Sequence, residues 1–228
     1  MYIQNIREGN PFMFSLIFDM DGTLFQTDRI LETSLHDTFN HLRSKGLWEE
    51  HAPIEKYREI MGVPLPIVWE TLLPGCSDQI RQQANEWFHE KLIANIEAGQ
   101  GALYPYIEEF FQYCKGKGIP IYIASNGQTE YLNSIVNYYH LDEWVTETFS
   151  IQQISSQNKS DLVRSIVEKY KITKGMVIGD RLSDIKAAKD NNLISIGCNF
   201  DFAQADELAQ ADRVIDSIEE LETLIGVL

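Results

Sequence analysis

Cysteine is scarce in this chain. Its 228 residues include three cysteines, Cys76, Cys114 and Cys198, an odd number at wide and irregular spacing. This spacing fits neither a disulfide framework nor a zinc site, so it predicts reduced thiols in a reducing compartment. The N-terminus also lacks the basic start and long apolar centre of a secretory signal. The expected location is therefore the cytoplasm.

Basic residues are also few. Lys and Arg together number 19 against 34 Asp and Glu, which gives a net charge of -15. Nucleic-acid polymers and anionic membranes are bound through basic patches, and no run of Lys or Arg supplies one. No segment approaches the roughly 20 apolar residues of a membrane span. These absences exclude a nucleic-acid polymer and a membrane as expected partners. A small anionic ligand remains possible if a local cation offsets the acidic field.

Short apolar runs recur along the chain with amphipathic segments between them. One such segment presents Leu162, Val163 and Ile166 on a single helical face. Nearly continuous apolar strands that alternate with helices are typical of a parallel sheet covered on both faces. The predicted fold class is therefore α/β with a Rossmann-like parallel sheet. Its predicted strands lie at 14–18, 119–124, 176–179, 193–197 and 213–216.

The segment between the first two predicted strands has a different pattern. It reads as several helices, for example 30–44 and 78–96, broken by Pro53 and by Pro74-Gly75. The predicted organisation is a discontinuous core of residues 1–27 and 102–228 with an inserted helical cap domain at 28–101. Ligands of open α/β sheets bind beyond the carboxyl ends of the strands. An insertion directly after the first strand is therefore expected to act as a lid.

The first predicted strand ends in a pair of carboxylates, Asp19 and Asp21. Side chains at i and i+2 of an extended segment point to the same side. Two unit charges about 4 Å apart repel by roughly 4 kcal/mol at an effective dielectric constant near 20. The pair therefore needs a cation, a shared proton or both. This requirement predicts a metal-assisted site in which one carboxylate is ionised and the other can carry a proton.

Other predicted strand ends also carry groups capable of chemistry. They are Ser125-Asn126-Gly127, Lys159 at the start of a helix, and Gly179-Asp180 followed by Asp184. In a doubly wound sheet the carboxyl ends of the strands lie along one edge. We therefore expect these groups to converge there with the two aspartates.

In these segments the chain resembles the haloacid dehalogenase superfamily, in its phosphatase branch. The resemblance covers nearly the whole chain, and the helical insertion resembles the family's type 1 cap. It implies a Rossmann-like core and a Mg²⁺-dependent hydrolase that cleaves phosphomonoesters through an aspartyl-phosphate. One departure is Lys159-Ser160, where the commoner family pattern is Lys-Pro. The matching motifs, in the family's order, are Asp19-Met20-Asp21-Gly22-Thr23-Leu24, Ser125-Asn126, Lys159 and Gly179-Asp180-Arg181-Leu182-Ser183-Asp184.

The resemblance also implies individual roles. Asp19 would be the nucleophile, and Asp21 would protonate the leaving group and then deprotonate the attacking water. Asp19, Asp180 and the backbone carbonyl of Asp21 would bind the metal. Lys159 would contact the transferring phosphoryl group and restrain the nucleophile.

The remaining implied roles concern the phosphate and the surrounding loops. Ser125 and Asn126 would donate hydrogen bonds to phosphate oxygens, with Gly127 allowing close backbone approach. Thr23 would orient its loop. Asp184 would act from behind the metal ligands, holding a metal-bound water or the lysine.

Simpler interpretations exist for each residue taken alone. Ser125-Asn126-Gly127 is a common turn sequence, and Asp184 could merely favour the N-terminal dipole of a helix. Lys159 could be a surface lysine. Arg58 in the insertion could face a substrate, although an exposed arginine is the commoner case.

The predicted function is hydrolysis of a small phosphorylated metabolite, as in phosphoglycolate phosphatase-like or nucleotidase-like members. Phosphoglycolate, a nucleoside monophosphate, a sugar phosphate and pyrophosphate all remain open, as does the oligomeric state. The alternative is a phosphomutase of the same fold, which would use Asp19 and Asp21 but exclude water. A dehalogenase would need neither Asp21 nor Asp180. A binding protein that has kept the fold without turnover is a further alternative.

Overall fold

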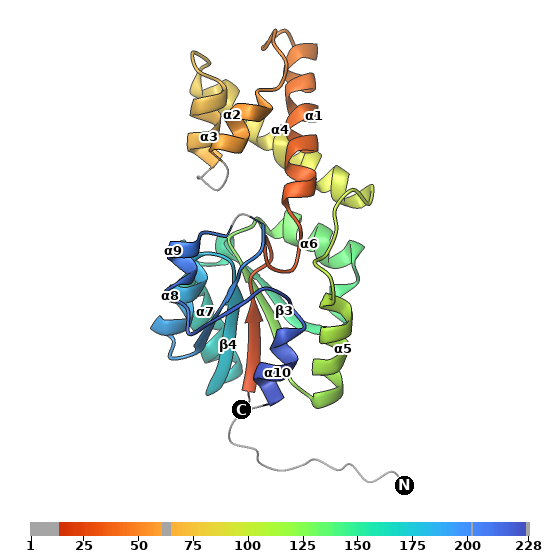
Figure 1. Cartoon of the computed structure of the whole chain (residues 1–228). Helices are drawn as coiled ribbons and strands as arrows, with labels where there is room; N and C mark the ends of the chain where they lie inside the picture. The colour runs from red at the N-terminus through yellow and green to blue at the C-terminus, as the bar shows by residue number, and fades with distance from the viewer. Residues whose placement is uncertain (1–13, 61–64, 202, 227–228) are drawn as a thin grey trace. The chain divides into compact units, whose positions relative to one another are not determined.

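The computed structural model describes residues 14–60, 65–201 and 203–226. Figure 1 shows the whole chain, which divides into two compact units. The core unit contains the described parts of 1–24, 105–128 and 142–228, and the helical unit contains those of 25–104 and 129–141. Among the described residues, no helix is long and apolar enough to cross a membrane.

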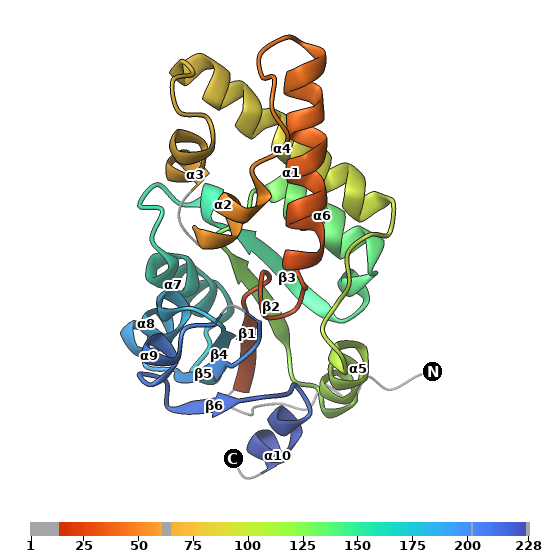
Figure 2. The same ribbon diagram turned by 45° about the horizontal axis from the view of Figure 1, so that its top comes forward.

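The core unit is built on a six-stranded sheet (Figure 2). Its strands are β1 (Phe14–Phe18), β2 (Ile121–Ser125), β3 (Val145–Ser150), β4 (Lys174–Gly179), β5 (Ile194–Cys198) and β6 (Arg213–Ile215). Their order is β3-β2-β1-β4-β5-β6, and every neighbouring pair is parallel. The central β1 therefore delivers the residue after it to the middle of the carboxyl edge, between β2 and β4.

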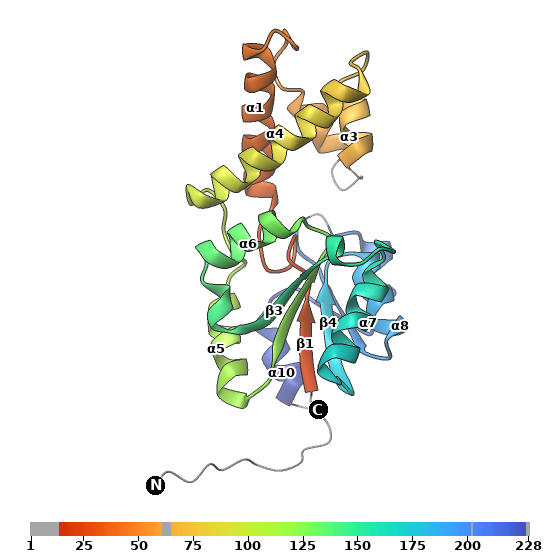
Figure 3. The same cartoon turned by 180° about the vertical axis from the view of Figure 1, so that it is seen from behind.

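Helices cover both faces of this sheet, as Figure 3 shows. They are α5 (Ile107–Lys117), α7 (Lys159–Tyr170), α8 (Leu182–Asp190), α9 (Ala205–Leu208) and α10 (Glu220–Gly226). Adjacent strand residues point to opposite faces. Ile17 accordingly joins the apolar cluster formed with α7 and α8, whereas Phe18 packs edge-on against Phe110 and Phe111 of α5. Both faces of β1 are buried, as its nearly continuous apolar sequence predicts.

The helical unit forms its own apolar core. Its helices are α1 (Asp28–Ser44), α2 (Ile54–Glu59), α3 (Leu65–Leu72), α4 (Asp78–Glu97) and α6 (Thr129–Tyr138). The buried faces of α1 and α4 pack together, and Asn95 between them donates a hydrogen bond to Ser34 at 2.9 Å. An isolated antiparallel bridge between Phe25 and Leu103 joins the two ends of the long insertion.

The predicted parallel α/β fold is confirmed, but the sequence analysis missed strand β3. This strand reads Val-Thr-Glu-Thr-Phe-Ser, and its middle residues are exposed or half-buried. It forms an edge of the sheet, where polar side chains are tolerated. The rule used to find strands, a continuous apolar run, therefore does not apply to it. The domain boundaries at 27/28 and 101/102 stay a prediction.

Candidate active site

Asp19 directly follows the central strand. Its backbone N–H donates to the carbonyl of Ile178 at 2.8 Å, which extends the pairing of β1 with β4 by one residue. The chain then turns tightly, since the N–H of Leu24 reaches back to the carbonyl of Met20 at 2.9 Å. These contacts hold the Asp19 carboxylate in a buried position, with 7% of the residue exposed.

Lys159 contacts this carboxylate. Its Nζ lies 2.5 Å from Asp19 Oδ1 and 2.8 Å from Asp184 Oδ1. Burial alone would lower the pKa of Lys159, but Asp184 and Asp19 outweigh burial and raise that pKa. Burial raises the pKa of Asp19 well above its usual range, although Lys159 opposes this effect. The lysine is therefore a buried cation within the cluster, as predicted from the sequence, and is not a surface residue.

Three carboxylates share this small volume. One oxygen from each of Asp19, Asp180 and Asp184 lies within 4.8 Å of the others. Burial raises the pKa of Asp180 to about 7, and repulsion by Asp184 contributes. Oδ1 of Asp180 is buried and has no hydrogen-bond partner among the described residues. One ammonium group does not balance three carboxylates, so an oxygen-coordinated divalent cation fits this donor set.

The membership of this cluster differs from the predicted ligand set in one respect. Asp184 was expected behind the metal ligands, holding a metal-bound water or the lysine, and its Oδ1 does lie 2.8 Å from Lys159 Nζ; its carboxylate also lies within the triplet. Asp21 was expected to contribute its backbone carbonyl, and its side chain is not one of the three. The charge on Asp21 nevertheless helps to raise the pKa of Asp19, so the two carboxylates are neighbours.

Two glycines make room for the carboxylates. Gly22 has a φ of +70°, and a Cβ there would lie 2.6 Å from Asp180 Oδ2. At Gly179 a Cβ would lie 2.3 Å from Asp184 Cγ. Both contacts are shorter than a side chain tolerates. At each position the absence of a side chain therefore leaves the space that the neighbouring carboxylate occupies.

The Ser125-Asn126-Gly127 segment lies at the end of β2, the neighbour of β1. The register pairs Phe18 with Ile123, so this segment and the residues after β1 share one edge of the sheet. Ser125 is buried and its Oγ accepts from the N–H of Gly127 at 2.9 Å, while Asn126 is exposed. The serine hydroxyl keeps its hydrogen for another acceptor.

Two further buried residues lie near the site: Thr23 is in the turn after Asp19, and Cys198 follows Gly197, which pairs with Gly179 just before Asp180. Both side chains are fully buried, and Cys198 ends β5. Burial raises the pKa of Cys198 well above its usual range, and Asp180, Asp184 and Asp19 raise it further. The thiol is therefore neutral. The sequence analysis did not single out Cys198.

Ser160, which stands after Lys159 in place of the commoner proline, makes several hydrogen bonds. The N-cap Asn158 accepts from the N–H of Ser160 at 2.8 Å. The Ser160 hydroxyl donates to Asp190 at 2.6 Å, and Asn191 donates to the Ser160 carbonyl at 2.9 Å. These contacts tie the start of α7 to the end of α8. The departure from the family pattern therefore leaves the lysine firmly held.

Two glutamates outside the predicted set also hold charged groups. Glu207 of α9 accepts from the N–H of Leu182 at 2.8 Å, which fixes the start of α8, and Arg181 Nε lies 3.7 Å from the same carboxylate. In the helical unit, Arg58 makes two hydrogen bonds to Glu32, at 2.5 and 2.8 Å. The charge of Arg58 is thus paired with Glu32 inside the helical unit.

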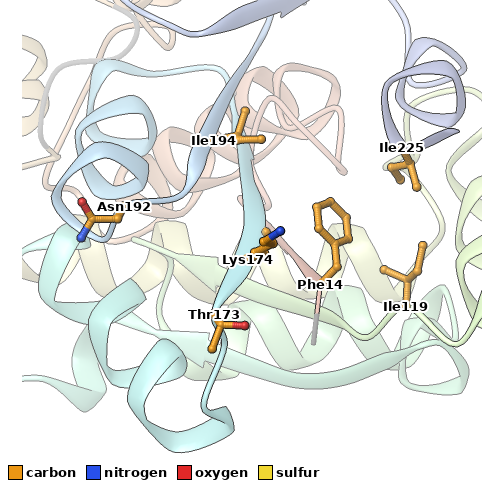
Figure 4. A pocket seen from close by; sticks show the side chains of 8 residues that line it. Phe14, Ile119, Thr173, Lys174, Asn192, Ile194 and Ile225 are labelled. Atoms are coloured by element: carbon orange, nitrogen blue, oxygen red, sulfur yellow. The ribbon is translucent and has the colours of Figure 1, made fainter. Parts of the chain in front are cut away.

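A large cavity lies at the opposite edge of the sheet. It measures about 570 Å³ and is lined by Phe14, Ile119, Thr173, Lys174, Gly175, Asn192, Ile194 and Ile225. Figure 4 shows Phe14, Ile119 and Ile225 grouped on one side of it. Phe14 and Ile194 begin their strands, so the cavity belongs to the amino edge. It contains none of the clustered carboxylates, so we assign the chemistry to the carboxyl edge.

Comparisons with known proteins agree on one family. The model for haloacid dehalogenase-like hydrolases matches residues 15–192. Protein CbbY of Cereibacter sphaeroides is 23% identical, with 93% of this chain and 96% of that protein covered. A phosphoglycolate phosphatase of Vibrio vulnificus is 21% identical over the same shares. The crystal structure of CbbY from Rhodobacter sphaeroides in complex with phosphate superimposes with a TM-score of 0.75 at 21% identity, covering 92% of this chain and 96% of the other.

Proposed function

Because the chain belongs to the haloacid dehalogenase-like hydrolases, we propose that it is a phosphatase that hydrolyses small phosphomonoesters through an aspartyl-phosphate on Asp19. The observation that carries this proposal is the buried cluster in which Lys159 contacts Asp19 beside two further carboxylates. Relatives named phosphoglycolate phosphatase and pyrophosphatase support it. The substrate class is a small phosphorylated metabolite.

The proposed metal is Mg²⁺. The donors are all oxygens, and the buried Oδ1 of Asp180, which has no hydrogen-bond partner among the described residues, is available to a cation. Asp19 and Asp180 would hold the ion together with the backbone carbonyl of Asp21, and Asp184 would bind it directly or through water. When bound, Mg²⁺ supplies positive charge that stabilises the phosphoryl oxygens.

Asp19 and Lys159 perform the first chemical step. A carboxylate that approaches a phosphate dianion meets repulsion of several kcal/mol, and the buried ammonium of Lys159 offsets part of it. Lys159 holds Oδ1 of Asp19, so Oδ2 remains as the attacking atom. An Asp19–phosphorus bond forms while the ester P–O bond breaks.

Asp21 moves the protons. It gives its proton to the departing alkoxide and then accepts one from the water that attacks the acyl phosphate. That attack releases inorganic phosphate and regenerates the Asp19 carboxylate. Asp21 is partly exposed, which suits a group that must exchange protons with water. Ser125 and Asn126 donate to the phosphate oxygens, and Gly127 lets the backbone approach.

We assign the helical insertion at 28–101 the role of a cap domain. It begins a few residues after Asp19, in the connection that follows β1. In α/β sheets this connection borders the ligand-binding edge. Selection among phosphorylated metabolites is therefore assigned to side chains of the insertion.

A metabolite panel tests this function. We expect phosphate release from at least one of phosphoglycolate, a nucleoside monophosphate, a sugar phosphate or pyrophosphate when Mg²⁺ is present. EDTA should abolish the release, and excess Mg²⁺ should restore it. Absence of release from a broad panel would reject the proposal. Transfer between positions of a bisphosphate without free phosphate would indicate a phosphomutase, and EDTA-insensitive halide release would indicate a dehalogenase.

Substitution of Gly22 tests the metal site without an activity assay. Gly22→Ala should displace Asp180 and destabilise the fold by about 2–4 kcal/mol, from positive φ and a steric clash together. Gly118→Ala is the matched control, because Gly118 has a φ of +69° and open space around it. In urea unfolding, Mg²⁺ should stabilise the wild type and Gly118→Ala but not Gly22→Ala. Equal stabilisation of both variants by Mg²⁺ would contradict the assignment.

A further inference from the structure

The loop at 126–128 is a short connection whose geometry depends on few contacts. It joins β2 to α6, and the chain leaves the core unit directly after Gln128. Two serine hydroxyls fix the peptide groups of Gly127. Ser125 Oγ accepts from its N–H at 2.9 Å, and Ser150 Oγ donates to its carbonyl at 2.6 Å. Because glycine has the widest backbone freedom, these two hydrogen bonds determine the backbone conformation of the loop at Gly127.

Ser150 is built into the sheet. It is the last residue of β3, pairs in register with Ser125 of β2, and is 1% exposed. Its Oγ also accepts from the N–H of Gln152 at 3.2 Å. A hydroxyl has one hydrogen, and here that hydrogen is directed to the Gly127 carbonyl. Ser150 therefore connects the loop to the edge strand through a fixed contact.

We propose that Ser150 is a positioning residue for phosphate binding. It holds the Gly127 carbonyl so that Ser125 and Asn126 present their donors to the phosphoryl group. Ser150 acts through Gly127 and does not itself contact the substrate. Small displacements of positioned donors cost substantial binding and rate. This inference rests on the proposed function, because that function makes the loop a phosphate site.

The test compares Ser150→Ala with Ser150→Thr and with Ser165→Ala. Threonine keeps the hydroxyl. Ser165 is a partly buried serine of α7 whose hydroxyl donates to the carbonyl of Leu162 at 2.7 Å, so its substitution removes a similar bond away from the loop. The probes are inorganic phosphate in calorimetric titration and p-nitrophenyl phosphate in steady-state kinetics, both with Mg²⁺. Amide hydrogen exchange at Gly127 gives a readout independent of turnover.

We expect Ser150→Ala to weaken phosphate binding and raise KM about five- to tenfold, the usual effect of one lost hydrogen bond. Exchange at Gly127 should become faster, Ser150→Thr should restore both values, and Ser165→Ala should change neither. If Ser150→Ala does not fold, Ser150→Cys takes its place as a variant of similar volume with a weak donor. Wild-type phosphate binding in the Ala or Cys variant would overturn this inference alone. A wild-type protein that neither binds nor releases phosphate would instead overturn the proposed function.

Discussion

Asp19→Asn is expected to lower turnover of any phosphomonoester substrate by roughly 10⁴-fold or more, the usual cost of removing a nucleophile. An amide does not form the acyl phosphate, and it is a weaker metal ligand than a carboxylate. The fold should persist, because Asn has nearly the same shape and its Oδ1 can still accept from Lys159. One buried negative charge is also removed from a cluster that holds three carboxylates. The measurement is kcat for the best substrate of the panel.

The matched control for this prediction is Asp142→Asn, which makes the same chemical change at an exposed position. Asp142→Asn should retain wild-type turnover. Rapid quenching and mass spectrometry should detect phosphorylated Asp19 in the wild type during turnover and none in Asp19→Asn. Comparable turnover by wild type and Asp19→Asn would eliminate the covalent mechanism.

The local sequence was sufficient to predict which polar side chains come together. Asp19, Lys159 and Asp180 were predicted from polar residues at strand ends, and the structure brings them into one cluster. The reason is geometric, because parallel strands that run in one direction must end at one edge. The resemblance to the haloacid dehalogenase superfamily, drawn from the same motifs, is confirmed by the family model. The strand ends of the sheet and the motifs of the family thus point to the same residues.

Residues that act through tertiary pairing were not predictable in this way. Ser150 depends on β3, an edge strand whose polar composition hides it, and on its register with β2. Glu207 reaches the start of α8 from a helix 25 positions later along the chain. Cys198 lies beside Asp180 because the register of β5 on β4 pairs Gly197 with Gly179. Neither pairing nor helix packing is encoded in a local pattern, so these residues need the assembled sheet.

Asp184 was only partly predictable from the local sequence. Its spacing from Asp180 was noted in the sequence, but that spacing fits either a residue that supports the site or one that merely favours the N-terminal dipole of a helix. The fold brings Asp184 close to the other carboxylates, because α8 begins right after β4 and Asp184 lies in its first turn. There its Oδ2 accepts from the N–H of Arg181 at 3.1 Å while Oδ1 faces Lys159. One carboxylate thus caps a helix and joins the cluster.

Lys159→Met should cost both activity and stability. Methionine fills a similar volume, but the variant leaves Asp19 and Asp184 without their buried cation. Loss of one partner from a buried ion pair typically costs about 3–5 kcal/mol of unfolding free energy. Turnover should fall by roughly 10²–10³-fold, as when one electrostatic donor is removed from a preorganised site. Denaturant unfolding and kcat measure the two effects.

Mg²⁺ should separate these two losses. A bound cation would neutralise part of the uncompensated charge in the buried cluster, and a ligand at 100 times its Kd stabilises a fold by about 2.7 kcal/mol. Added Mg²⁺ should therefore return much of the stability of Lys159→Met while turnover stays low, because the ion does not replace the ammonium that holds Asp19. Lys186→Met, at an exposed position of the same α8 that carries Asp184, should show neither loss. If Lys159→Met, like Lys186→Met, lost neither stability nor turnover, Lys159 would have no role in the cluster, and the electrostatic account of the cluster would fail.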